Sequence, residues 1–77
     1  MAREEDRKKF VELASKRVNR TLKDIQLIGN LSNRSNYDYT DQDVAKIFKA
    51  LTDEAAACRK RFEQASRKSA DTMFVLE

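Results

Sequence analysis

The chain offers almost no interruption to helical structure, because its 77 residues include no proline and only one glycine, Gly29. Proline lacks the backbone N–H that a helix needs, and glycine loses the most conformational freedom on becoming helical, so these are the strongest helix breakers. Lys, Arg, Glu, Ala and Leu, which favour helices, are frequent in the chain. The sequence therefore predicts an all-α protein in which two long helices flank a single break.

Before Gly29, apolar residues recur every three or four positions, which predicts a helix over about residues 4–28. The recurring positions are Val11, Ala14, Val18, Leu22, Ile25 and Ile28. Phe10, Leu13 and Leu27 widen this stripe on its flanks, so it is broader than a two-stranded coiled coil requires. Gly29 follows directly, and we expect it to adopt the left-handed conformation that ends many helices.

The start of the second helix is marked by several residues together. Thr40 can cap the helix while Asp43, three residues later, accepts a hydrogen bond from the backbone, as in a capping box. Asp41 adds negative charge at the positive end of the helix dipole. Tyr39 and Val44 occupy the two positions of a hydrophobic staple. The sequence therefore predicts that the second helix begins directly after Thr40.

The second helix, over about residues 41–68, carries a heptad-like repeat typical of a coiled coil. Its apolar or small residues are Val44, Phe48, Leu51, Ala55, Cys58, Phe62 and Ala65. Small side chains in the middle would let another helix approach closely. We expect Cys58 to be a small buried apolar residue rather than a reactive thiol.

These boundaries predict one domain over residues 1–77, folded as an antiparallel helical hairpin with a turn at 29–39 and an apolar tail at 69–77. A chain of this size gains little stability from its own core, so we expect a homo-oligomer, with a dimer favoured. Two interpretations of the tail stay open. It either extends the second helix or folds back. We expect its apolar residues to pack on the first helix or on a second subunit rather than to recognise an outside partner.

The residue types that most catalytic and cofactor sites require are missing. There is no His to act as a general base or metal ligand, and a single Gly cannot form a phosphate-binding loop. Cys58 is the only cysteine, which excludes an intramolecular disulfide and a thiolate cluster. We therefore predict that the protein is not an enzyme and has no catalytic, cofactor-binding or metal-binding residues.

Two features of the sequence bear on localisation. Residues 1–9 are nearly all charged and lack the apolar segment of a secretory signal, and no apolar run approaches 18 residues. We therefore expect a cytoplasmic protein with no membrane partner.

The segment from Gly29 to Thr40 is longer than most connections between antiparallel helices and rich in hydrogen-bonding side chains. One interpretation is structural: its Asn and Ser side chains satisfy backbone groups of the turn. The other is recognition of a protein partner, since Tyr and Arg are favoured at binding hot spots. The candidate recognition residues are Asn33, Arg34, Asn36 and Tyr37.

Positive charge concentrates at the two ends of the sequence. Residues 1–20 together with 59–77 hold twelve Lys or Arg against seven Asp or Glu, whereas residues 21–58 hold four against six. An antiparallel hairpin would bring both ends together and could present them to phosphates. The candidate phosphate-contacting residues are Lys8, Lys9, Lys16, Arg17, Arg20, Arg59, Lys60 and Arg61.

The run from Arg17 to Thr40, RVNRTLKDIQLIGNLSNRSNYDYT, together with DVAKIFKAL at residues 43–51, resembles a group of short uncharacterised bacterial proteins. The resemblance covers roughly residues 10–62. It implies a bacterial or bacteriophage source and a free-standing small protein, and no activity or ligand is associated with that group.

Taken together, the sequence predicts a non-catalytic helical interaction module that binds a protein partner through its turn and helix faces. The alternative is a nucleic-acid-binding accessory protein that uses the basic end of the hairpin.

Overall fold

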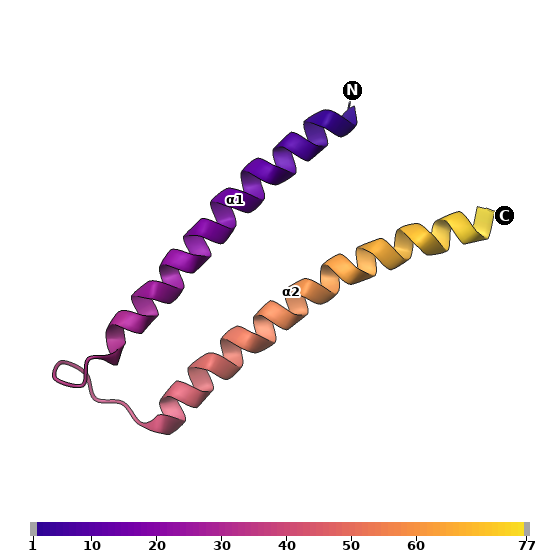
Figure 1. The fold of residues 1–77 in the computed structure, drawn as a ribbon. Helices are drawn as coiled ribbons and strands as arrows, with labels where there is room; N and C mark the ends of the chain where they lie inside the picture. The colour runs from indigo at the N-terminus through magenta and orange to yellow at the C-terminus, as the bar shows by residue number, and fades with distance from the viewer. Residues whose placement is uncertain (1, 77) are drawn as a thin grey trace. The chain divides into compact units, whose positions relative to one another are not determined.

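The computed structural model describes the backbone of residues 2–76 and the side chains of residues 3–66. It contains α1 (Ala2–Gly29), a short 3₁₀ helix η1 (Asn30–Ser32) and α2 (Asp41–Leu76), which run from indigo to yellow in Figure 1. No strand occurs within residues 2–76. The prediction of an all-α protein is therefore confirmed.

The chain divides into two compact units, Met1–Asp38 and Tyr39–Glu77. The first unit holds α1, η1 and the turn after them, and the second holds α2. The boundary falls inside the polar connection, where the sequence predicts the turn between the helices.

Gly29 does not adopt the expected left-handed conformation, so that prediction is wrong. Its φ of −59° and ψ of −31° are those of a right-handed helix, and it forms the last residue of α1. The chain tightens directly from Gly29 into η1, and 3₁₀ bonds are one way to satisfy the carbonyls at a helix end without a left-handed residue. The helix stops only at Asn33, which is extended with φ −71° and ψ 102°.

The start of α2 matches its prediction, with Thr40 as the cap. The Asp43 N–H donates to Thr40 Oγ1 at 3.1 Å, and the Thr40 N–H donates back to Asp43 Oδ2 at 2.9 Å. The first helical bond, from the Val44 N–H to the Thr40 carbonyl, is 3.2 Å. The reciprocal bonds of a capping box satisfy backbone donors that the first turn of a helix leaves unpaired.

Beyond residue 68, where the sequence predicts the helix to end, α2 continues to Leu76. Of the two interpretations of residues 69–77, extension of the helix is the one observed for residues 69–76, and Glu77 lies outside the described residues. No Gly or Pro follows Gly29 in the sequence, so nothing there breaks the helix.

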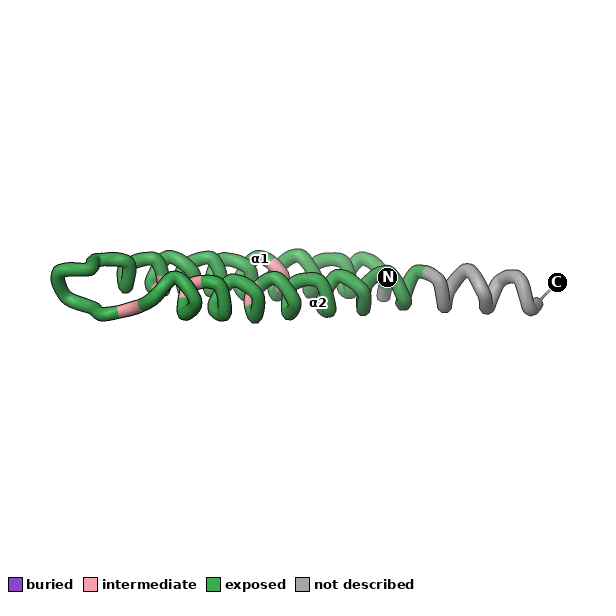
Figure 2. Tube along the Cα trace, turned by 90° about the horizontal axis from the view of Figure 1, so that it is seen from below, coloured by how far each residue is buried: buried purple, intermediate pink, exposed green. Residues whose placement is uncertain are grey.

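Neither helix has a core of its own, as the predominantly green tube in Figure 2 shows. Among residues 3–66 no side chain is buried. The residues of intermediate exposure are Ala14, Ile28, Tyr39, Val44 and Leu51. Tyr39 and Val44 are the pair that the sequence assigns to the hydrophobic staple, and their reduced exposure agrees with that assignment.

The helical conformation of Gly29 makes a simple prediction about stability. A Cβ added at Gly29 meets no atom within 4 Å. Gly29→Ala should therefore stabilise the fold by about 0.5–1 kcal/mol, because alanine loses less backbone entropy in a helix. Thermal unfolding followed by circular dichroism measures the change. A lower melting temperature would contradict the helical conformation, since alanine is strained where φ is positive.

Candidate interaction surfaces

Most of the apolar stripe of α1 is open to solvent, and Ala14 and Ile28 within it are of intermediate exposure. Its exposed large side chains are between 40% and 55% exposed. They are Phe10, Val11, Val18, Leu22 and Ile25. Thr21 lies beside this stripe, and its hydroxyl donates to the Arg17 carbonyl at 2.9 Å, so this polar group is satisfied within the helix. The stripe therefore remains suited to packing against an apolar partner.

The heptad-like repeat of α2 is exposed in the same way, and we call it the α2 seam. Phe48 and Phe62 on the seam, and Ile47 beside it, are between 38% and 59% exposed, while Leu51 is of intermediate exposure. Cys58 is also exposed, contrary to the expectation of a buried residue. In heptad notation Phe48, Ala55 and Phe62 fall at positions a. Val44, Leu51, Cys58 and Ala65 fall at positions d.

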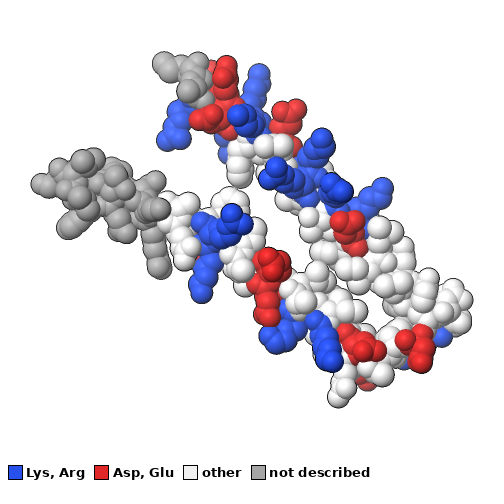
Figure 3. All heavy atoms as spheres, turned by 180° about the vertical axis from the view of Figure 1, so that it is seen from behind, with Lys and Arg blue, Asp and Glu red and all other residues white. Residues whose placement is uncertain are grey.

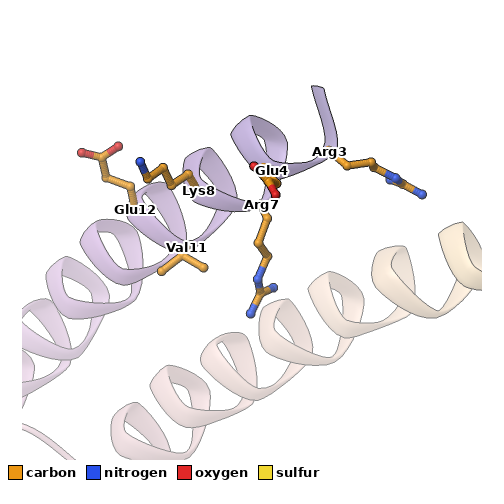
Figure 4. Close-up of a pocket in the computed structure, with 6 residues that line it drawn as sticks. All are labelled: Arg3, Glu4, Arg7, Lys8, Val11 and Glu12. Atoms are coloured by element: carbon orange, nitrogen blue, oxygen red, sulfur yellow. The ribbon is translucent and has the colours of Figure 1, made fainter. Parts of the chain in front are cut away.

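A shallow hollow on α1 is formed by residues of that helix alone, as Figure 4 shows. Its lining residues are Arg3, Glu4, Arg7, Lys8, Val11 and Glu12. In the close-up Lys8 and Glu12 point away from Arg7 and Val11, so the side chains diverge rather than enclose a ligand. The Arg7 guanidinium lies 5.9 Å from the centre of the Phe10 ring, within the range of a cation–π contact. The hollow is an open helix surface and does not have the shape of an active site.

A second hollow lies on α2, over the alanines at 56 and 57. Helical geometry places these alanines on the side opposite the α2 seam. Nearby, Lys49 Nζ lies 2.8 Å from Asp53 Oδ2, with the two side chains 76% and 65% exposed. A solvent-exposed pair of this kind contributes at most about 1 kcal/mol. This face of α2 is therefore a charged, solvated surface.

In the connection, Asn33 organises the turn that carries the candidate recognition residues. Its carbonyl accepts from the N–H groups of Asn36 at 3.1 Å and Tyr37 at 3.0 Å. Its side-chain Oδ1 accepts from the Ser35 N–H at 3.0 Å, which forms an Asx turn. For Asn33 the structural interpretation is therefore confirmed.

The remaining candidates, Arg34, Asn36 and Tyr37, come after Asn33 within the same unit. Tyr37 is 49% exposed, and Leu27 and Leu31 of this unit are exposed to a similar degree. Helical geometry puts Leu27 off the α1 stripe, because the two residues after Ile25 turn the chain by about 200°. Leu27, which the sequence places on the flank of the stripe, therefore lies on the other side of α1.

The candidate phosphate-contacting residues divide between the two helices. Five of them are on α1 and three on α2, in different units. On α2, Arg59, Lys60 and Arg61 are consecutive, so they point about 100° apart around the helix. Figure 3 shows acidic side chains in red among the basic ones in blue on both helices. The charge is therefore mixed rather than concentrated.

The described side chains also contain no cluster that could hold a metal. Within that part of the chain, no group of three His, Cys, Asp or Glu residues lies close enough to bind an ion. In addition, no helix among the described residues is long and apolar enough to cross a membrane.

No family model, no curated protein and no solved structure matches the chain. The resemblance of residues 10–62 to short bacterial proteins therefore stays a prediction.

Proposed function

We propose that this chain is a non-catalytic interaction module. In this proposal α1 and α2 pair through their apolar faces as an antiparallel hairpin, the hairpin associates with a second copy, and the connection binds a protein partner. The observation that carries the proposal is the exposure of both apolar faces. Burying one Val, Leu, Ile or Phe side chain contributes about 1.5–3 kcal/mol, so such faces strongly favour being covered.

The spacing of the apolar residues supports antiparallel pairing of the two helices. The steps back along α1 from Ile25 to Leu22, Val18 and Val11 equal the steps forward along α2 from Phe48, although Ala14 and Cys58 between them are offset by one residue. If Ile25 faces Phe48, the next layers bring together Leu22 with Leu51, Val18 with Ala55, and Val11 with Phe62. All these layers join apolar side chains, and amphipathic helices gain most of their stability from packing of this kind.

The connection suits recognition of a protein because its backbone is fixed while an aromatic side chain is exposed. The bonds to Asn33 define the turn, and Tyr37 projects from it at 49% exposure. Leu27 and Leu31 add exposed apolar surface in the same unit. Tyr is enriched at binding hot spots, where it contributes a large contact area at low entropic cost.

The alternative, binding of nucleic acid, has less support. Phosphate binding favours basic residues clustered on one face, whereas here acids are interleaved with bases on both helices. The net charge of +3 is small for a protein of this length that binds through the phosphate backbone.

Substitution of Leu51 tests whether the apolar faces drive association. In sedimentation equilibrium at tens of micromolar we expect a dimer for the wild type. Leu51→Asp should raise the dissociation constant by about tenfold to a hundredfold, because it removes a buried leucine from the contact.

The matched control is Ala56→Asp, which also introduces an aspartate into α2 but on the side of the helix away from the seam and not beside Glu54 or Arg61. It should leave the dissociation constant within about threefold of wild type. Equal weakening by both variants would show that loss of helix propensity, and not the seam, explains the effect.

Substitutions at two positions in the connection separate folding from recognition. Asn33→Ala removes the acceptor of the Asx turn and should lower the free energy of unfolding by about 1 kcal/mol, whereas Asn33→Asp keeps an oxygen there and should be tolerated.

Tyr37→Ala should leave the melting temperature nearly unchanged and weaken capture of a protein partner by the immobilised chain. A drop in melting temperature as large as that of Asn33→Ala would mean that Tyr37 packs within the fold and is not a recognition residue.

A further inference from the structure

We propose that α2 pairs with α2 of a second copy, antiparallel, with Ala55 of each copy opposite Cys58 of the other. This inference rests on the self-association in the proposed function and specifies its contact. Positions a and d of a bundle helix point toward the bundle axis and touch both neighbouring helices. The α2 seam can therefore contact α1 on one side and the second α2 on the other.

The charges that flank the seam favour this register. Glu54 and Arg61 both occupy g positions, on the same edge of the seam. When Ala55 faces Cys58 of the second copy, antiparallel geometry brings Glu54 of each copy beside Arg61 of the other, which gives two attractive pairs by symmetry. Opposite charges at these flanking positions set the partner and orientation of paired helices.

Registers shifted by one heptad are disfavoured by the same two residues. A shift in one direction places Glu54 beside Glu54 of the second copy, and a shift in the other places Arg61 beside Arg61. Like charges at such positions are destabilising. The sequence therefore selects one antiparallel register among its neighbours.

Neither charged residue has an opposite charge to pair with on its own helix. Side chains three or four positions apart are neighbours on a helix. For Glu54 these neighbours are Ala50, Leu51, Ala57 and Cys58, and for Arg61 they are Ala57, Cys58, Gln64 and Ala65. An opposite charge for either residue must therefore come from another segment or another copy.

The sizes of the seam residues favour the antiparallel over the parallel arrangement. In the proposed register Phe48 faces Ala65, Phe62 faces Leu51, and each phenylalanine thus meets a smaller side chain. A parallel pair would place Phe48 on Phe48 and Ala55 on Ala55, so wide and narrow layers would alternate. The proposed register avoids layers of two phenylalanines, although its two central layers of Ala55 and Cys58 are narrow. In a parallel pair, Glu54 would instead lie beside Arg59 of the second copy. Arg59 already has an oppositely charged neighbour, Glu63, four positions away on its own helix.

Disulfide trapping between two full-length proteins, each with one cysteine, tests the arrangement. One is the wild type, with Cys58, and the other is Ala55→Cys/Cys58→Ala carrying a tag that separates the species by mass. A disulfide needs Cα atoms within about 7 Å, which the proposed register provides only between Cys58 and residue 55 of the other copy. In a mixture under mild oxidation, the mixed disulfide should exceed both symmetric disulfides by about tenfold.

The control partner is Ala57→Cys/Cys58→Ala, whose thiol lies away from the seam and should form mixed disulfides only at the rate of random collision. Symmetric disulfides in excess would overturn the antiparallel arrangement in favour of a parallel one. A mixed disulfide no faster than the control would overturn the α2 contact altogether. Sedimentation of the uncrosslinked wild type then separates the two proposals. A dimer would mean that the chain self-associates through a different contact, whereas a monomer would contradict both self-association and the α2 contact.

Charge variants give an independent readout of the same contact. Glu54→Arg should raise the dissociation constant of the dimer about tenfold, and Glu54→Arg/Arg61→Glu should restore it to within about threefold of wild type. Restoration by Glu54→Arg/Arg59→Glu instead would overturn the proposed register, because it would identify the parallel pairing.

Discussion

The exposure of two long apolar faces is the physical constraint on which the packing of the two helices depends. The helices are 28 and 36 residues long, and no side chain among residues 3–66 is buried. Hydrogen bonds within each helix satisfy its backbone, but helices of this composition gain most of their stability from packing of an amphipathic face. In the proposed arrangement the α1 stripe and the α2 seam cover each other and are covered further by the helices of a second copy.

The polar connection has a different physical basis, because local bonds define it. Asn33 holds the turn through its carbonyl and its side chain, and the capping box at Thr40 fixes where α2 begins. Neither feature depends on how the apolar faces are covered. This independence lets the segment between the helices keep its local conformation while Tyr37 stays exposed.

Features set by a few neighbouring residues could be predicted from the sequence. The capping box is one, since Thr40 and Asp43 interact across a single turn of helix. The conformation of Gly29 could not be predicted in the same way, because it depends on whether the chain continues into a 3₁₀ turn. The end of α2 lies later than predicted, since a fading apolar pattern does not break a helix that contains no Gly or Pro. The sequence predicted a buried Cys58, and its exposure could not be predicted because burial depends on which segments come together and not on residue type alone.

The most direct test of the central claim is the helicity of the wild-type chain as a function of its concentration. If covering of the apolar faces by a second copy stabilises the helices, circular dichroism at 222 nm should weaken on dilution from tens of micromolar to well below one micromolar. The melting temperature should fall in parallel, as linkage between folding and association requires. Undiminished helicity and an unchanged melting temperature at concentrations where the chain is monomeric would contradict the account.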